Sequence, residues 1–184
     1  MTVNIIPPHG GYQNLLSFQK ARIVYDATVK FCADLLDKRD RTVDQMTQAA
    51  RSGKQNIAEG SAASGASKET ELKLTSVARA SLEELLTDYR DFLRTHGLAE
   101  WPKNHPYVRR LQALNRLPHA DYGTFRKAVE HADMEIRANA IIGLIKVTTY
   151  LLDRQIRQLE QAFLREGGLR ERMSRARQAV RERM

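Results

Sequence analysis

Apolar residues recur at the spacing of an α-helix through four long segments of this chain. The segments cover about residues 14–36, 42–60, 67–95 and 133–165. Nowhere do apolar and polar residues alternate with period two, as they do in a half-buried β-strand, for more than a few residues. Long helices with short early connections favour antiparallel neighbours. The sequence therefore predicts an all-α protein, folded as an up-and-down four-helix bundle.

The second and third predicted helices have recognisable ends. Thr42 and Gln45 match a capping box. In this motif the Thr hydroxyl accepts from a backbone N–H of the first turn, and the Gln side chain reaches back to the backbone N–H of the Thr. Gly60 is expected to end that helix in a loop of small residues. Ser67 is placed to cap the third helix, and Gly97 follows its last turn.

Three prolines divide the chain between the third and fourth long segments into short pieces. Tyr107–Arg116 and Tyr122–Ala132 are each long enough for a helix of two or three turns. After Gly167-Gly168, apolar residues at i, i+4, i+7 and i+11 predict a basic amphipathic helix. The predicted organisation is an N-terminal turn segment (1–13), the bundle with its basic insertion 97–132 (14–166) and a basic tail (167–184).

The positive charge of the chain is concentrated in two segments. The net charge is +8. Residues 101–127 hold six basic side chains against one acidic, and residues 165–184 hold seven arginines against three glutamates. Basic and acidic side chains nearly cancel elsewhere. This distribution predicts localised positive fields that attract an anionic partner.

Aromatic residues accompany the cations of the insertion, namely Trp101, Tyr107, Tyr122 and Phe125. Cations beside rings that stack on bases are typical of proteins that bind single-stranded or structured RNA. Guanidinium groups also suit phosphate. The residues predicted to bind nucleic acid are Arg109, Arg110, Arg116, Arg126, Lys127, Arg170, Arg172, Arg175, Arg177, Arg181 and Arg183. Two alternatives remain: the rings pack the insertion onto the bundle, or the tail docks on a neighbouring subunit.

The second half of the second helix carries almost no large apolar residue. Ser52, Asn56, Glu59 and Gly60 share one face, where small residues permit a close helix neighbour. The third helix offers polar partners there, Arg79, Ser81 and Glu84. We expect Glu59 to be bound by Arg79, Arg51 or an N–H of the following loop, and Asn56 to hydrogen-bond across to the third helix. Such a network would fix helix register, as a buried Asn does in a coiled coil.

These residues also resemble a known family pattern. Ser52-x-x-x-Asn56-Ile57-Ala58-Glu59-Gly60-Ser61, followed by Ala78-Arg79-x-Ser81-Leu82-x-Glu84-Leu85, is similar to the "SxxxNIxEG…ARxSLxEL" pattern of a bacterial four-helix-bundle family. That family comprises proteins of ribosomal RNA intervening sequences and the accessory variability protein of diversity-generating retroelements. The resemblance covers about residues 14–95. The insertion and tail make the chain look like the longer branch, the four-helix-bundle suffix proteins.

The resemblance implies more than a fold. Relatives form pentameric barrels, bind nucleic acid through basic surfaces and dock a reverse transcriptase. It therefore implies a homo-oligomer, a pentamer, with RNA or DNA and a partner enzyme such as a reverse transcriptase.

The sequence offers little for metal binding or catalysis. None of the five histidines forms a His-x-x-x-His or Glu-x-x-His pair. His131 and Glu135, at i and i+4, are the one pair that we considered for a metal, and a solvated helix start is the favoured interpretation. Cys32 lies among apolar residues, which favours a buried, inert thiol. We expect no metal, no cofactor and no catalytic site.

Two further observations bear on the compartment. The first residues lack the charged and apolar regions of a secretion signal. The most apolar run, 138–152, contains Lys146 and is too short for a membrane span. We expect a cytoplasmic protein without a membrane partner.

Two functions remain for such a chain. The first is a non-catalytic, oligomeric, nucleic-acid-binding scaffold that is accessory to a reverse transcriptase or another nucleic-acid enzyme. The second is a protein–protein interaction or assembly module without a nucleic-acid role, whose basic face meets an acidic partner or a partner helix.

Overall fold

The protein was examined in a computed structural model that describes residues 10–182. Within these residues the chain is all-α and contains no strand, as predicted. No helix among them is both long enough and apolar enough to cross a membrane. The elements are a short 3-10 helix η1 (Tyr12–Asn14) and the helices α1 (Leu16–Leu35), α2 (Arg41–Ala63), α3 (Lys68–Thr95), α4 (Pro106–Asn115), α5 (Tyr122–Val129), α6 (Met134–Glu166) and α7 (Leu169–Arg181).

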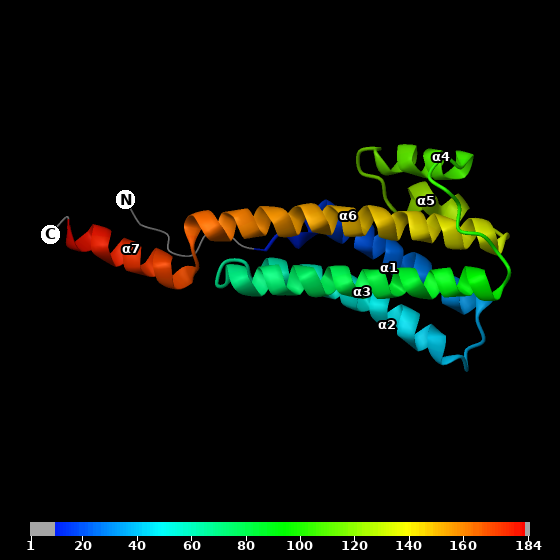
Figure 1. Ribbon diagram of the computed structural model, residues 1–184, viewed down its shortest axis with the longest axis horizontal. Coiled ribbons are helices and arrows are strands. Elements are labelled where there is room, and N and C mark those ends of the chain that lie inside the picture. Colours follow the sequence, from blue (N-terminus) through cyan, green and yellow to red (C-terminus); the bar gives the residue numbers. More distant parts are fainter. Residues whose placement is uncertain (1–9, 183–184) are drawn as a thin grey trace.

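Four long helices lie side by side, and we call α1, α2, α3 and α6 the long-helix body (Figure 1). Helix α2 packs against α1 and α3, and α6 packs against the same two helices. Helices α1 and α3 run in one direction, and α2 and α6 run in the other (Figure 1). Each long helix therefore turns an apolar face towards a shared core, which includes Phe31, Leu82, Tyr89 and Leu144, all fully buried.

Aromatic rings fill the core where α1 meets α3. Phe31 makes edge-to-face contacts with Tyr89 and Phe92, with ring centroids 5.0 Å and 4.8 Å apart. The buried hydroxyl of Tyr89 donates a hydrogen bond of 3.1 Å to Oγ1 of Thr28, which satisfies it inside the core. Burial raises the pKa of Tyr89 far above its ordinary value, so the phenol stays neutral.

The small residues of α2 allow α3 to approach closely. A Cβ added to Gly53 would lie 2.7 Å from Cγ and Cδ2 of Leu82. One added to Gly60 would lie 3.3 Å from the carbonyl oxygen of Glu71. The hydroxyls of Ser52 and Ser81 lie 2.9 Å apart and link the two helices by a hydrogen bond. The close neighbour predicted for this face of the second helix is therefore α3.

Two partners predicted for this face are wrong. Asn56 does not reach α3: its Nδ2 donates to the carbonyl oxygen and hydroxyl of Ser52, one turn earlier in the same helix. Glu59 is exposed, and its Oε1 accepts from Nε2 of Gln55 rather than from Arg79, Arg51 or the following loop. The helix continues beyond Gly60 to Ala63, so Glu59 lies outside its last turn. The negative end of the helix dipole therefore destabilises the Glu59 carboxylate little.

The start of α2 also differs from the prediction. The helix begins at Arg41, and the carboxylate of Asp40 accepts from the backbone N–H of Thr42. Asp40 is an equally good N-cap residue two positions earlier, so Thr42 becomes part of the first turn. Ser67 caps α3 as predicted, because its hydroxyl accepts from the N–H of Thr70.

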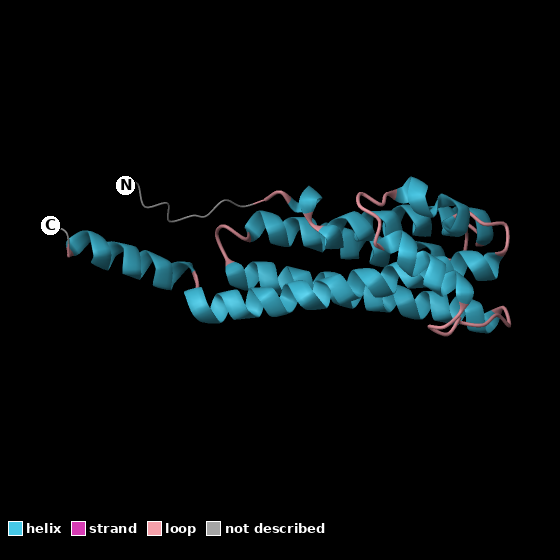
Figure 2. Ribbon diagram, turned by 90° about the horizontal axis from the view of Figure 1, so that it is seen from above, coloured by secondary structure: helices cyan, strands magenta, loops and turns pink. Residues whose placement is uncertain are grey.

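The basic insertion and the tail attach differently. Helices α4 and α5 lie against the N-terminal half of α6, and α5 also contacts α1. Leu111, Phe125 and Val129 are buried there. Helix α7 extends beyond the other end of the long-helix body and buries none of its residues (Figure 2). The turn into it is made at Gly167, whose φ of 69° favours glycine.

Candidate nucleic-acid interface

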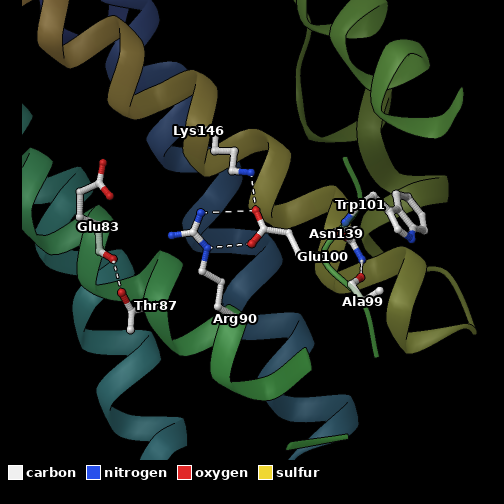
Figure 3. Close-up of polar contacts among 8 residues, drawn as sticks. All are labelled: Glu83, Thr87, Arg90, Ala99, Glu100, Trp101, Asn139 and Lys146. Carbon is white, nitrogen blue, oxygen red and sulfur yellow. Dashed lines mark hydrogen bonds and ion pairs between the residues drawn. The ribbon is translucent and has the colours of Figure 1, made fainter. Parts of the chain in front are cut away.

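The segment that leads into α4 is held in place by Asn139 of α6. The side chain of Asn139 accepts a hydrogen bond of 2.8 Å from the backbone N–H of Trp101 and donates one of 2.9 Å to the carbonyl oxygen of Ala99 (Figure 3). A buried amide that bonds backbone groups on both sides of residue 100 fixes the path of the chain. Asn139 therefore sets where the insertion leaves the long-helix body.

Glu100 adds an ionic link at the same point. Its carboxylate accepts from Nε of Arg90 on α3 at 2.8 Å and from Nζ of Lys146 on α6 at 2.5 Å (Figure 3). Partial burial raises the pKa of Glu100, but the bonds from Arg90 and Lys146 outweigh that effect and the net shift is downward. The carboxylate thus stays charged and joins the linker to two helices.

Trp101 is anchored rather than free. Its Nε1 donates to Oε1 of Glu135 at 2.8 Å, and its ring stacks on His105 with centroids 4.2 Å apart. Tyr107 lies 5.4 Å from the same ring and is 48% exposed. The three aromatic rings form one cluster at the start of α4, with Tyr107 as its outermost member.

Five cations of the insertion are exposed to solvent without an acidic partner. These are Lys103, Arg109, Arg110, Arg116 and Lys127, and none forms an ion pair with a carboxylate of residues 10–182. Arg126 pairs with Glu130 at 3.8 Å, a long contact one helical turn away. Exposed pairs of that kind contribute little. The positive charge predicted for this segment is therefore available to an external anion.

The other rings of the insertion have packing roles. Phe125 is fully buried, so it attaches α5 to the long-helix body and offers no stacking surface. The hydroxyl of Tyr122 donates to Glu130 at 2.8 Å. Burial, and then the bond to that carboxylate, raises the pKa of Tyr122 to about 12. The packing interpretation of the insertion's rings thus holds for Phe125 and not for Tyr107.

A cleft of about 360 Å³ lies between α4, α5 and the start of α6, and we call it the α4–α5 cleft. It brings together Arg110 of α4 and Lys127 of α5, and its lining also includes Tyr107, His131 and Ala140. Two unpaired cations on facing helices beside an exposed ring are suited to a phosphate next to a base.

The tail presents a second, separate cationic surface. Arg170, Arg177 and Arg181 are exposed on α7 and have no carboxylate partner within residues 10–182. Arg172 is half-buried, and two of its nitrogens find no hydrogen-bond partner among the described residues. Arg183 lies outside those residues.

Arg175 of α7 makes a hydrogen bond to the long-helix body. Its Nη2 donates to the backbone carbonyl oxygen of Glu166, at the end of α6. The last carbonyls of a helix have no intrahelical partner, and a guanidinium satisfies one of them. In this structure Arg175 therefore ties α7 to α6 through one of its N–H groups, while its exposed guanidinium has no carboxylate partner within residues 10–182.

The two basic segments do not form one surface. Helices α4 and α5 lie near the start of α6, whereas α7 begins after its last residue (Figure 1). An α-helix rises 1.5 Å per residue, so the 33 residues of α6 span about 50 Å. Any nucleic acid that contacts both segments must run along much of the length of the molecule.

The remaining motif residues are structural. Nε of Arg79 donates to Oδ1 of Asp153 at 2.5 Å, which links α3 to α6. Arg79 also lies 3.8 Å from Glu83. Glu84 is exposed on α3. Asn139, Glu100 and Asp153 were not predicted as partners, although an Asn within the apolar stretch of a long helix indicates a buried hydrogen-bond network.

The pair considered for a metal is engaged otherwise. Nδ1 of His131 accepts from the backbone N–H of Asp133, and Glu135 accepts from Trp101. Over residues 10–182 there is no group of three or more His, Cys, Asp or Glu side chains that could hold a metal ion. Burial raises the pKa of the Cys32 thiol to about 11, which favours its inert, protonated form.

Comparisons of the chain with protein-family models, with curated proteins and with solved structures found no match.

Proposed function

We propose that this protein is a non-catalytic, nucleic-acid-binding scaffold, built on an up-and-down four-helix bundle of α1, α2, α3 and α6. The observation that supports the proposal most is the set of unpaired, exposed cations at Arg109, Arg110, Arg116 and Lys127. Polynucleotides bind strongly to such cationic surfaces, because the cations replace counterions condensed on the phosphate backbone. The long-helix body supplies a rigid support for them.

The family resemblance of α2 and α3 extends the proposal. It implies that the chain assembles with further copies, as a pentamer, and presents RNA or DNA to a partner enzyme such as a reverse transcriptase in the cytoplasm. The pairwise packing of the four long helices supports the fold that this family has.

A second candidate is supported by one feature of α7. Leu169, Met173, Ala176 and Val180 form an apolar stripe on a helix that buries none of its residues. A helix with such a stripe is typical of one that docks in a groove of a partner. An assembly module without a nucleic-acid role therefore remains the alternative.

The test is a comparison of two triple variants with equal charge loss. In the first, Arg109, Arg110 and Arg116 are replaced by Gln; in the second, Arg39, Arg41 and Arg51 are replaced by Gln. The second set is exposed on or next to α2, which does not pack against α6, the helix that carries α4. Binding to single-stranded RNA and to duplex DNA is measured over a range of salt concentrations.

We expect the first variant to bind more weakly and its salt dependence to flatten. Each lost phosphate contact lowers the log–log slope by about 0.7 on single strands and about 0.9 on duplex DNA. The second variant should retain the wild-type slope. Equal losses in both variants would show that only net charge matters, and absence of binding by the wild-type protein at low salt would end the proposal.

A further inference from the structure

A second cleft lies on the other side of α4, between α4 and α6, and we call it the α4–α6 cleft. Its volume is about 380 Å³, and most of its lining is apolar. Its lining includes Trp101, Lys103, Gln112, Asn115, Gly143 and Tyr150.

Gly143 lies on α6 in the wall of this cleft, and packing does not explain it. A Cβ at Gly143 would meet only Cδ1 of Leu111, at an ordinary contact distance of 3.9 Å. By contrast, a Cβ at Gly53 would collide with Leu82. A glycine inside a helix is also less favourable than an alanine at the same position. Because Gly143 has no side chain, the space between α6 and α4 stays open at this point.

The walls of the cleft suit a flat aromatic ligand. Trp101 stands at one end, held by its bonds to Asn139 and Glu135. Tyr150 of α6 also lines the cleft and is 57% exposed, without a role in the core. Two rings and an apolar floor are the surfaces on which nucleobases stack.

One wall of the cleft also carries an unsatisfied acceptor. Nδ2 of Asn115 donates to the carbonyl oxygen of Leu111, but Oδ1 of the same side chain is buried and has no hydrogen-bond partner within residues 10–182. A buried acceptor without a partner lowers stability, and a ligand N–H would satisfy it. Gln112, one turn earlier on α4, adds an exposed amide with both a donor and an acceptor.

One unpaired cation lines the same cleft, and two others are next to lining residues in the sequence. Lys103 lines it, is exposed and has no carboxylate partner in the described part of the chain. Arg109 and Arg116 directly follow the lining residues Val108 and Asn115 in the sequence, and both are exposed. A ligand with a flat ring would suit Trp101 and Tyr150. An N–H group on that ring would suit Oδ1 of Asn115, and an attached phosphate would suit Lys103.

We propose that the α4–α6 cleft binds one unpaired base of a single-stranded nucleic acid. The base lies on the apolar floor between Trp101 and Tyr150, one of its N–H groups donates to Oδ1 of Asn115, and the adjoining phosphate lies at Lys103. This inference rests on the proposed function and adds a preference for single strands, because the bases of a duplex are already paired and stacked.

The experiment uses the only tryptophan of the chain, Trp101, as its reporter. Trp101 fluorescence is titrated with uridine monophosphate, with a short oligouridine and with the duplex of that oligouridine and oligoadenosine. The wild-type protein is compared with Gly143→Leu, which fills the cleft, and with Asn115→Leu, which removes the acceptor at similar volume. Thermal unfolding of each variant checks its fold, and neither substitution should lower the melting temperature.

We expect oligouridine to quench Trp101 in the wild-type protein, and both variants to bind it about tenfold more weakly. Salt-dependent binding of the duplex should be unchanged in both variants, since it depends on the exposed cations. If both folded variants bind oligouridine as the wild type does, the cleft proposal is overturned and the proposed function stands. If the wild type binds none of the polynucleotides, the proposed function itself fails.

Discussion

At the scale of single residues, Arg137 shows how this fold accommodates a buried charge. Arg137 is 4% exposed, and its Nη2 donates to Oδ2 of Asp34 at 2.8 Å. The guanidinium carbon also lies 5.8 Å from the centroid of Phe31. A guanidinium inside a protein is tolerated only when a partner compensates its charge. Asp34 supplies that compensation from α1, across the interface with α6.

Asp34→Asn tests this arrangement. The variant leaves Arg137 without a counter-charge, so the free energy of unfolding should fall by about 2 kcal/mol. The loss is below that of a fully buried pair because the Asp34 side chain is 32% exposed. Urea unfolding at pH 7 measures it. Asp26→Asn, at an exposed position of the same helix, is the control and should change stability little.

The pH dependence of the free energy of unfolding is a second test of the pair formed by Asp34 and Arg137. Hydrogen bonds from Lys30 and then Arg137 lower the pKa of Asp34 below its ordinary value of 3.8. The folded state therefore holds the proton less tightly than the unfolded state, and the stabilisation is complete above pH 3.8 and lost as the pH falls through the lowered pKa. The difference between wild type and Asp34→Asn should shrink in that acidic window. A difference that stays constant would contradict the assignment.

At the scale of helices, glycines have opposite roles in α2 and α6. Gly53 is required for the close contact of α2 with α3, because Leu82 is fully buried and cannot move away from a Cβ at 2.7 Å. Gly143 meets no such contact. The same residue type in a helix interior thus supports helix packing in one place and an open cleft in the other.

Alanine substitutions at the two glycines should therefore change stability in opposite directions. Gly53→Ala should lower the free energy of unfolding by about 1–3 kcal/mol, since the strain of overpacking exceeds the gain in helix propensity. Gly143→Ala should raise it by up to about 1 kcal/mol. Chemical denaturation of both variants measures the two changes. A stabilised Gly53→Ala protein would show that the contact of α2 with α3 is looser than described.

At the scale of the whole molecule, the buried core and the excess positive charge lie in different parts. The long-helix body holds the core and most of the ion pairs, including Arg79 with Asp153 and Arg137 with Asp34. The exposed cations of α4 and α5 and those of α7 lie at opposite ends of α6, whereas cations of the long-helix body such as Arg41 and Arg51 lie in a part of the chain where basic and acidic side chains nearly cancel. Charge placed on attached helices leaves the stability of the core independent of the binding surfaces.

Deletion of residues 167–184 tests that independence. Because α7 buries none of its residues, the melting temperature should stay at the wild-type value. The salt dependence of nucleic-acid binding should flatten by about 0.7 per lost phosphate contact on single strands. Light scattering of the same sample reports the subunit number. Dissociation of an oligomer on deletion, with the salt dependence intact, would favour the assembly role of α7.

Much of the fold follows from local sequence patterns. Helical periodicity predicted all of the long helices, and Ser67 and Gly167 were recognised because capping and hinge residues act on neighbours within one turn. The prediction that Thr42 caps α2 was wrong, because Asp40 lies two positions earlier and caps equally well. Local competition of that kind shifts a helix end but not the helix itself.

The sequence alone thus determined the helices, their order and the two segments that carry excess charge, since each depends on residues near one another in the chain. Tertiary structure decided which groups meet: Ser52 with Ser81 rather than Asn56 with α3, and Asn139 with the backbone on both sides of residue 100. It also placed the two basic segments at opposite ends of α6 and opened clefts on both sides of α4. Such contacts depend on the packing angle and rotation of whole helices, which side chains distant in sequence set together.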